Sequence, residues 1–442
     1  MNPFTLKELR QLTRSKVISG TLVGFLLSAL LLSYFIPVGG VSYNTGRTLF
    51  SVIQLALGVL TLFILPANVF VRMMKERGGK RAADLTLATA LPASAVVDGK
   101  IRSALALIGL SLTAALPFAS FAYLLHGISL GRMAESLLIV ALLASVLVHF
   151  AILIASLRLS AGFRWVAYIA FVVIGVGVGL PACSAAFSWR CGVESQTFQR
   201  GFGFFVLAAV CVSLCLFLRA FAIAVLTPRS REHDLVLRVT TLVLVAGWGV
   251  YAYLHSGDAI RVWTVFAFLV FTVLSIFALV QPVGYSRRQI AAFRTKPIWR
   301  RIVFWPFMSG AANGFAFAFA GALAVSLVRP LLGNGQDTKW IAFTILLYDS
   351  ALLLVLRAFW RIAAKRWTDL SPVLVLALFL PVLGFLQSLP NLLGVEAAAV
   401  PFCYHGLKDG VIFDHHLLWS FVAFAVALVL NVPALVRTRS IA

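Results

Sequence analysis

Residues 17–36 read VISGTLVGFLLSALLLSYFI and contain no charged side chain. A helix needs about 20 predominantly apolar residues to cross the hydrocarbon core of a bilayer, and this stretch supplies them. A cleavable secretory signal has a shorter apolar core that ends at a small-residue cleavage site. Neither property is present here, so we predict that residues 17–36 form an uncleaved first transmembrane span.

The composition extends this prediction to the whole chain. Of its 442 residues, 61% are hydrophobic and 12% are charged, and the mean hydropathy is +0.98. A soluble protein carries about 25% charged residues. No soluble fold could hide so much apolar surface, so we expect an all-α polytopic membrane protein.

The same length rule predicts about twelve transmembrane helices. They are residues 17–36, 49–71, 101–124, 136–157, 163–185, 202–226, 236–255, 260–281, 303–328, 340–358, 371–388 and 417–436. Long basic segments at 72–102 and 282–302 each follow the second span of a six-span half, which suggests an internal duplication. We therefore expect a 6+6 arrangement, with halves at 1–226 and 236–442 joined by a cytoplasmic linker at 227–235.

The net charge of +22 agrees with this topology. In a soluble protein such a charge would suggest a nucleic-acid partner. In a membrane protein, Lys and Arg collect at the cytoplasmic ends of the spans. With both termini in the cytoplasm, most of the 37 Lys and Arg residues fall in cytoplasmic segments. We therefore expect both termini to be cytoplasmic, membrane lipid to surround the chain, and no nucleic acid to bind it.

Residues 71–100, VRMMKERGGKRAADLTLATALPASAVVDGK, form a polar interruption on the predicted cytoplasmic side. Residues 82–91 contain no Gly or Pro and predict a short helix that Pro92 ends. Ser94 can then cap the third span. Two interpretations are open: a solvated loop that carries positive-inside charge, or a surface helix with basic flanks that docks a soluble partner.

The chain resembles the type-2 ABC exporter permease family at three places within residues 1–240. Residues 2–16, NPFTLKELRQLTRSK, are similar to the N-terminal amphipathic helix of that family. Residues 116–129, LPFASFAYLLHGIS, are similar to the exit of its third span. In the 71–100 stretch, the matching motifs are Glu76–Arg77, Gly78–Gly79, Asp84–Leu85, Pro92 and Gly99–Lys100.

The resemblance implies a six-helix permease fold in a bacterial inner membrane, resting on a separate ABC-type ATPase. The residues expected to couple the two subunits are Glu8, Arg10, Glu76, Arg77, Asp84, Pro92, Gly99 and Lys100. The chain contains no G-x-x-x-x-G-K-[ST] segment to cradle ATP phosphates. ATP hydrolysis is therefore expected on the partner, and the chain is expected to be no enzyme by itself and to need no cofactor.

The second half matches the family less well. Its loop, YSRRQIAAFRTKPIWRR at 285–301, offers Arg287, Arg288 and Arg301 but lacks the acidic residue expected beside the first basic pair. If the halves are true repeats, one chain forms the whole pathway and binds two ATPase subunits. If only the first half is permease-like, the chain must form a homodimer.

Two ionisable residues fall inside predicted spans. Asp349, in ILLYDSALLL, is the clearest acid, and intramembrane acids are usually paired or functional. It could contact substrate or carry a proton, or form a structural pair with Tyr348 or a basic residue. His149 is more simply explained as a structural histidine bonded to a neighbouring group. Asp349 supports an alternative function, an ion- or proton-coupled secondary transporter; a non-transporting membrane scaffold is a further alternative.

Cysteine and histidine residues give weaker indications. Cys183 and Cys191 lie on the predicted outer side, where a disulfide between them is permitted. Cys211 and Cys215 lie one turn apart within a span and are expected to be packing residues. The loop CYHGLKDGVIFDHH at 403–416 has metal-ligand residue types but no standard zinc spacing, so no metal site and no catalytic residues are predicted.

Overall fold

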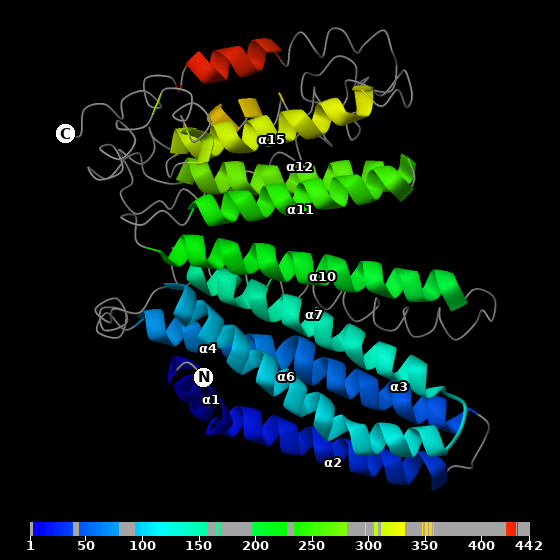
Figure 1. Ribbon diagram of the computed structural model, residues 1–442. Coiled ribbons are helices and arrows are strands. Elements are labelled where there is room, and N and C mark those ends of the chain that lie inside the picture. The colour runs from blue at the N-terminus through cyan, green and yellow to red at the C-terminus, as the bar shows by residue number, and fades with distance from the viewer. Residues whose placement is uncertain are drawn as a thin grey trace, which may run out of the picture. The chain divides into compact units, whose positions relative to one another are not determined.

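The computed structural model describes residues 3–38, 44–78, 93–157, 197–227, 234–255, 257–280, 305–307 and 311–331, with short pieces at 165–166, 168–169, 297, 347, 350–351, 353–355, 357, 421–429 and 431. All regular structure within these residues is helical, which confirms the predicted all-α class (Figure 1). The chain divides into two compact units, Met1–Thr227 and Pro228–Ala442. Each unit is described separately below.

The first unit is a bundle of long apolar helices with an amphipathic N-terminal helix packed at one end. Its elements are α1 (Pro3–Thr13), α2 (Lys16–Val38), α3 (Thr45–Gly58), η1 (Val59–Ile64), α4 (Leu65–Gly78), α6 (Ala93–Leu124), α7 (Leu130–Ser156) and α10 (Thr197–Leu226). The helices α3, η1 and α4 form one continuous element, with the wider π-helical turn of η1 just before Pro66. Proline removes a backbone donor and its ring crowds the preceding turn, which explains the change of helical pitch there.

The core of the first unit lies between α3 and α6. Leu49, Ile53 and Leu57 of α3 are buried in one cluster with Ala115 and Ala119 of α6. Small side chains on one helix let the facing helix approach closely, as in many membrane bundles. The approach is closest at the start of α3. A Cβ at Gly46 would lie 2.3 Å from the carbonyl oxygen of Ala122, so only glycine fits there.

The second unit contains α11 (Asp234–His255), α12 (Gly257–Val280), the short 3-10 helix η3 (Trp305–Phe307) and α15 (Ala311–Leu331). Helices α12 and α15 pack side by side (Figure 1). At their contact, the ring of Phe271 fills the space above Gly321, where a Cβ would lie 2.3 Å from a ring carbon. Phe271 also meets Phe317 of α15 edge to face. This aromatic contact holds the two helices together.

Six helical segments among the described residues are long and apolar enough to cross a membrane. They are Lys16–Val38, Thr45–Glu76, Ala93–Leu124, Leu130–Ser156, Phe204–Leu226 and Asp234–His255. Each contains or overlaps a predicted span. Helices α12 and α15 hold shorter apolar stretches, Val262–Ala278 and Asn313–Leu327. These observations support a membrane-spanning protein.

The structure corrects the extent of the polar interruption at 71–100. Helix α4 continues to Gly78 and α6 begins at Ala93, so the third long helix starts eight residues before the predicted position 101. Ser94 lies inside α6 and does not cap its N-terminus, contrary to the prediction. Among the charged residues of these helix ends, Glu76, Asp98 and Lys100 are each paired with a residue of another helix, as shown below. The predicted helix at 82–91 lies outside the described residues.

Candidate functional site

Lys100 connects three helices of the first unit at one point. Its Nζ atom lies 3.1 Å from Oε1 of Glu8 on α1 and 2.7 Å from Oε2 of Glu76 at the end of α4. The side chains of Lys100 and Glu8 are 5% and 6% exposed, whereas that of Glu76 is 40% exposed. A lysine this deeply buried needs a carboxylate partner, and here it has two.

Arg72 adds a second cation to this group. Its Nη2 donates to the backbone carbonyl of Gln11 on α1 at 3.0 Å, and its Nε donates to Oδ1 of Asn68 at 3.0 Å. Its guanidinium also interacts electrostatically with Glu8 and Glu76. We call Glu8, Arg72, Glu76 and Lys100 the Lys100 cluster. The two negative charges of its carboxylates balance the two positive charges of its cations, which suits a site whose centre, Glu8 and Lys100, is buried.

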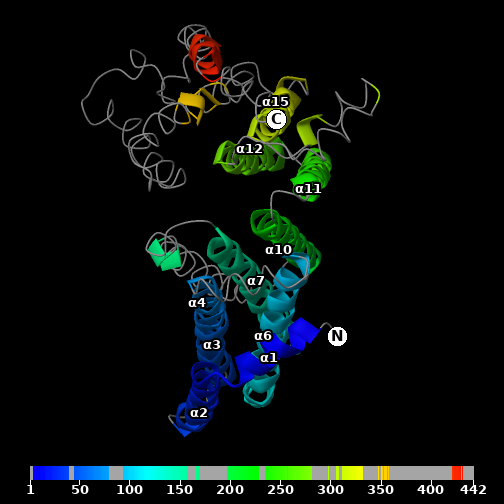
Figure 2. The same cartoon turned by 90° about the vertical axis from the view of Figure 1, so that its left-hand side faces the viewer.

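The Lys100 cluster fixes α1 to the bundle. Helix α1 packs on α6 at the end of the first unit where α2 begins, as Figures 1 and 2 show. Between α1 and α2, the hydroxyl of Ser19 donates to the carbonyl of Thr13 at 3.1 Å and bridges the break in the chain. A displacement of α1 or of the C-terminal end of α4 would therefore act directly on the start of α6.

A second ion pair holds the opposite side of α6. Nε and Nη2 of Arg219 on α10 donate to the two carboxylate oxygens of Asp98 at 2.6 and 2.8 Å. Such a two-pronged contact is the strong geometry of an arginine–carboxylate pair. Because Asp98 and Lys100 are two residues apart, they project from different sides of α6. The start of this helix is thus tied to α1 and α4 through one residue and to α10 through the other.

The remaining predicted residues of the first unit lie in different surroundings. Arg10 is exposed, whereas Glu8 faces the interior and Gly99 is buried within α6. Arg77 belongs to α4. His149 is buried, and its Nδ1 lies 2.7 Å from the carbonyl oxygen of Ser145 one turn earlier. That bond satisfies one ring nitrogen within the helix, as a structural histidine requires.

Other predicted positions lie outside the described residues. These are Asp84, Pro92, Cys183, Cys191, Arg287, Arg288, Arg301, Tyr348, Asp349 and the loop at 403–416. Cys211 and Cys215 are free thiols; Cys211 is buried, and the Cys215 sulfur lies 3.5 Å from the Ser145 hydroxyl. Within the described part of the chain, no group of three or more metal-ligating side chains comes together.

Sequence reasoning missed the pair formed by Asp98 and Arg219. A signal was present, because Arg219 interrupts the apolar run LCLFLRAFAIA and a cation within a span calls for an acidic partner. Asp98 is the acid nearest the start of α6 in the sequence. Arg72 was likewise not singled out. A signal was present, because Arg72 and the predicted coupling residue Glu76 are four positions apart, which places them on one face of a helix.

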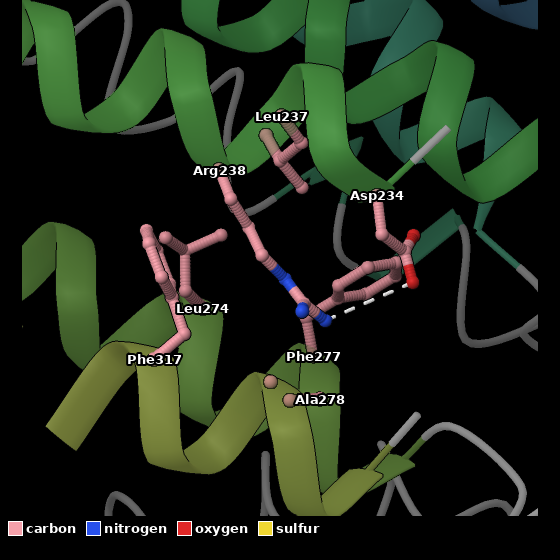
Figure 3. A pocket seen from close by; sticks show the side chains of 8 residues that line it. Asp234, Leu237, Arg238, Leu274, Phe277, Ala278 and Phe317 are labelled. Atoms are coloured by element: carbon pink, nitrogen blue, oxygen red, sulfur yellow. Dashed lines mark ion pairs between the residues drawn. The ribbon is translucent and has the colours of Figure 1, made fainter. Parts of the chain in front are cut away.

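The second unit contains a buried cation of its own, Arg238 of α11, which is 4% exposed. It donates through Nη1 to the carbonyl of Pro306 in η3, and its Nη2 lies 3.8 Å from Oδ2 of Asp234. Its guanidinium also lies over the ring of Phe317, 5.8 Å from the centroid. Figure 3 shows Arg238 reaching into a small pocket that α11, α12 and α15 surround.

The Arg238 pocket anchors η3, the first described helix after the basic loop at 282–302. Asn313 of α15 is fully buried and donates to the carbonyl of Trp305 at 2.7 Å. Arg238 holds the next carbonyl, that of Pro306. Gly314 makes room for this arrangement, since a Cβ there would lie 2.5 Å from the Cβ of Ala278. A buried cation thus pins η3, as Lys100 pins the C-terminal end of α4 in the first unit.

Comparison with protein-family models, with curated proteins and with solved structures gives no match. The resemblance to type-2 ABC exporter permeases therefore stays a prediction that rests on the sequence motifs.

Proposed function

We propose that this chain is the transmembrane permease subunit of an ATP-driven exporter, energised by a separate ABC-type ATPase. In this proposal it has twelve spans in a 6+6 arrangement, lies in a bacterial inner membrane and keeps both termini in the cytoplasm. The first unit receives the ATPase at α1 and at the segment between α4 and α6. The positive-inside distribution of Lys and Arg supports this orientation.

The observation that carries the proposal is the Lys100 cluster. The family resemblance selects Glu8, Glu76 and Lys100 from segments far apart in the sequence, and the three side chains meet at one point. They join the helix and the loop that would rest on an ATPase to the third long helix of the bundle. A rigid ionic link of this kind is suited to passing a movement of the partner into the membrane helices.

The residues divide into two roles in this mechanism. Glu8 and Lys100 are buried, so they position α1, α4 and α6 and do not face a partner. Glu76 is partly exposed, so it can contact an ATPase surface. Closure of the ATPase pair on ATP would press on α1 and the loop after α4, and the Lys100 cluster would move α6 with them.

The test is purification of the tagged chain from its native membrane in mild detergent, with mass identification of what remains bound. We expect a soluble ATPase in a fixed ratio to the chain. Asp84→Lys should remove it, because Asp84 lies in the loop expected to contact the partner. Asp258→Lys makes the same charge change at the start of α12, on the opposite predicted side, and should leave binding intact.

The ratio of the two proteins also distinguishes the possible assemblies. Two ATPase subunits per chain would indicate that one chain forms the pathway, and one per chain would indicate a homodimer. Absence of any ATPase from the wild-type preparation, under conditions that preserve other membrane complexes, would overturn the proposal. Equal loss in the Asp84 and Asp258 variants would argue against docking at the first loop.

A further inference from the structure

The exposed side of α1 and the start of α2 carries four cations. Lys7, Arg10, Arg14 and Lys16 are all exposed. Residues 7, 10 and 14 recur at the spacing of a single helical face. The ion pairs of the described residues involve none of the four. This surface, which we call the α1 basic face, therefore presents a concentrated positive charge.

The fold removes the negative charge that would offset this face. Glu8 is the only acidic residue among residues 1–16, and its carboxylate is turned inward to Lys100. In the sequence alone, residues 7–10, Lys-Glu-Leu-Arg, place one acid between two bases. The structure separates these charges, with the acid inside and the bases outside.

The surroundings of the α1 basic face indicate what it contacts. Helix α2 begins at Lys16, three residues after the end of α1, and only 11% of its most apolar stretch is buried within the protein. Its large side chains Val23, Leu27 and Leu30 are more than half exposed. A transmembrane helix with such a surface is bordered by lipid acyl chains, so lipid headgroups lie at its polar end, where the cations are.

Apolar side chains at the same level support this placement. Leu6 is 41% exposed on α1 and Val17 is 57% exposed at the start of α2. Exposed apolar residues interspersed with Lys and Arg are typical of helices that lie in the membrane interface. A soluble protein partner would require these apolar groups to be covered by it, whereas a bilayer covers them without any further component.

We propose that the α1 basic face binds the phosphate headgroups of anionic lipids. Each Lys or Arg near an anionic surface adds to the attraction, and long side chains can extend toward the headgroups while their stems lie on apolar surface. Bound lipid fixes α1 at the membrane surface from outside, while the Lys100 cluster fixes it to the bundle from inside. The inference does not depend on an ATPase partner or on which side of the membrane α1 lies.

The test measures lipid selectivity of the full-length protein. The protein is equilibrated in mixed micelles with equal amounts of phosphatidylglycerol and phosphatidylcholine, washed with detergent, and the retained lipids are quantified by mass spectrometry. We expect wild type to retain phosphatidylglycerol in excess. In the variant K7Q/R10Q/R14Q/K16Q, the ratio of retained phosphatidylglycerol to phosphatidylcholine should fall by about tenfold or more.

A matched control separates the α1 basic face from net charge. The variant R287Q/R288Q/R294Q/K296Q removes four cations from the loop of the second half and should keep the wild-type selectivity. High salt should reduce wild-type selectivity, because exposed charges are screened. If the four-residue α1 variant aggregates, R10Q/R14Q is used and should shift selectivity in the same direction.

Two results would overturn the inference. Wild-type selectivity in the α1 variant would show that the basic face does not bind these lipids. Equal loss in both four-residue variants would show that overall charge alone is responsible. The charge-conserving variant K7R/R10K/R14K/K16R keeps all four cations and should retain the wild-type selectivity.

Discussion

Nζ of Lys100 lies 3.1 Å from Oε1 of Glu8, although the two residues are 92 positions apart in the chain. Both side chains are almost fully buried. The contact brings the amphipathic N-terminal helix against the third long helix and leaves the polar stretch at 71–100 anchored at both ends. It also explains why a lysine stands near the start of α6, because Lys100 is an internal ion-pair partner.

Replacement of Lys100 by methionine should destabilise the first unit strongly. It keeps the length of the side chain but leaves the buried carboxylate of Glu8 without its nearest cation, which typically costs about 3–5 kcal/mol. The melting temperature in detergent micelles checks this. The double variant K100M/E8Q should recover much of the loss, and a K100M protein as stable as wild type would contradict the geometry.

The two carboxylates of the Lys100 cluster should differ in importance. Glu8→Gln should cost more stability than Glu76→Gln, because the Glu76 side chain is 40% exposed and water can replace part of its interaction. Each substitution neutralises one carboxylate that contacts Lys100, so each variant is the control for the other. Equal melting temperatures for the two variants would mean that burial does not distinguish them.

The pair formed by Asp98 and Arg219 should show measurable coupling. A double-mutant cycle with D98N and R219Q is expected to give about 1–2 kcal/mol, because the contact has two hydrogen bonds but both side chains are partly exposed. The cycle is read from unfolding in detergent. Strict additivity of the two substitutions would mean that α6 and α10 are held by other contacts.

Gly314 offers a test of the Arg238 pocket. Gly314→Ala places a Cβ 2.5 Å from Ala278 Cβ and 3.0 Å from Nη2 of Arg238, and overpacking of this kind costs about 1–3 kcal/mol. Gly247→Ala is the matched control, because no atom lies within 4 Å of the added group. It should be neutral or stabilising, since alanine favours helix over glycine by about 1 kcal/mol. The melting temperature of Gly314→Ala should therefore lie below that of Gly247→Ala, and equal melting temperatures would contradict the close packing at Gly314.

Much of the helical architecture could be predicted from apolar length alone. Residues 17–36 predicted α2 almost to its ends because one uninterrupted apolar run suffices to define a span. The start of α6 was placed eight residues too late because Asp98 and Lys100 look like loop residues when read singly. Both are paired with residues from other helices, and a local pattern carries no information about such partners.

The candidate site was foreseen only in part. Resemblance to a permease family selected Glu8, Glu76 and Lys100, but each was expected to act at a surface in contact with a partner. Burial of Glu8 follows from the packing of α1 on α6, which the helical periodicity of residues 3–13 does not specify. Arg238 was not singled out from the sequence, because its enclosure by α11, α12 and α15 depends on tertiary packing.

The most direct test of the central claim separates the stability of the Lys100 cluster from its role in coupling. The K100M/E8Q variant removes the buried ion pair while leaving no unpaired charge between these two residues. It is purified with the ATPase that accompanies wild type, and ATP hydrolysis and ATPase occupancy are measured on both complexes. We predict that the folded double variant keeps its ATPase but turns over ATP severalfold more slowly than wild type. Wild-type turnover in a folded, fully occupied K100M/E8Q complex would contradict the claim that this cluster couples the ATPase to the membrane helices.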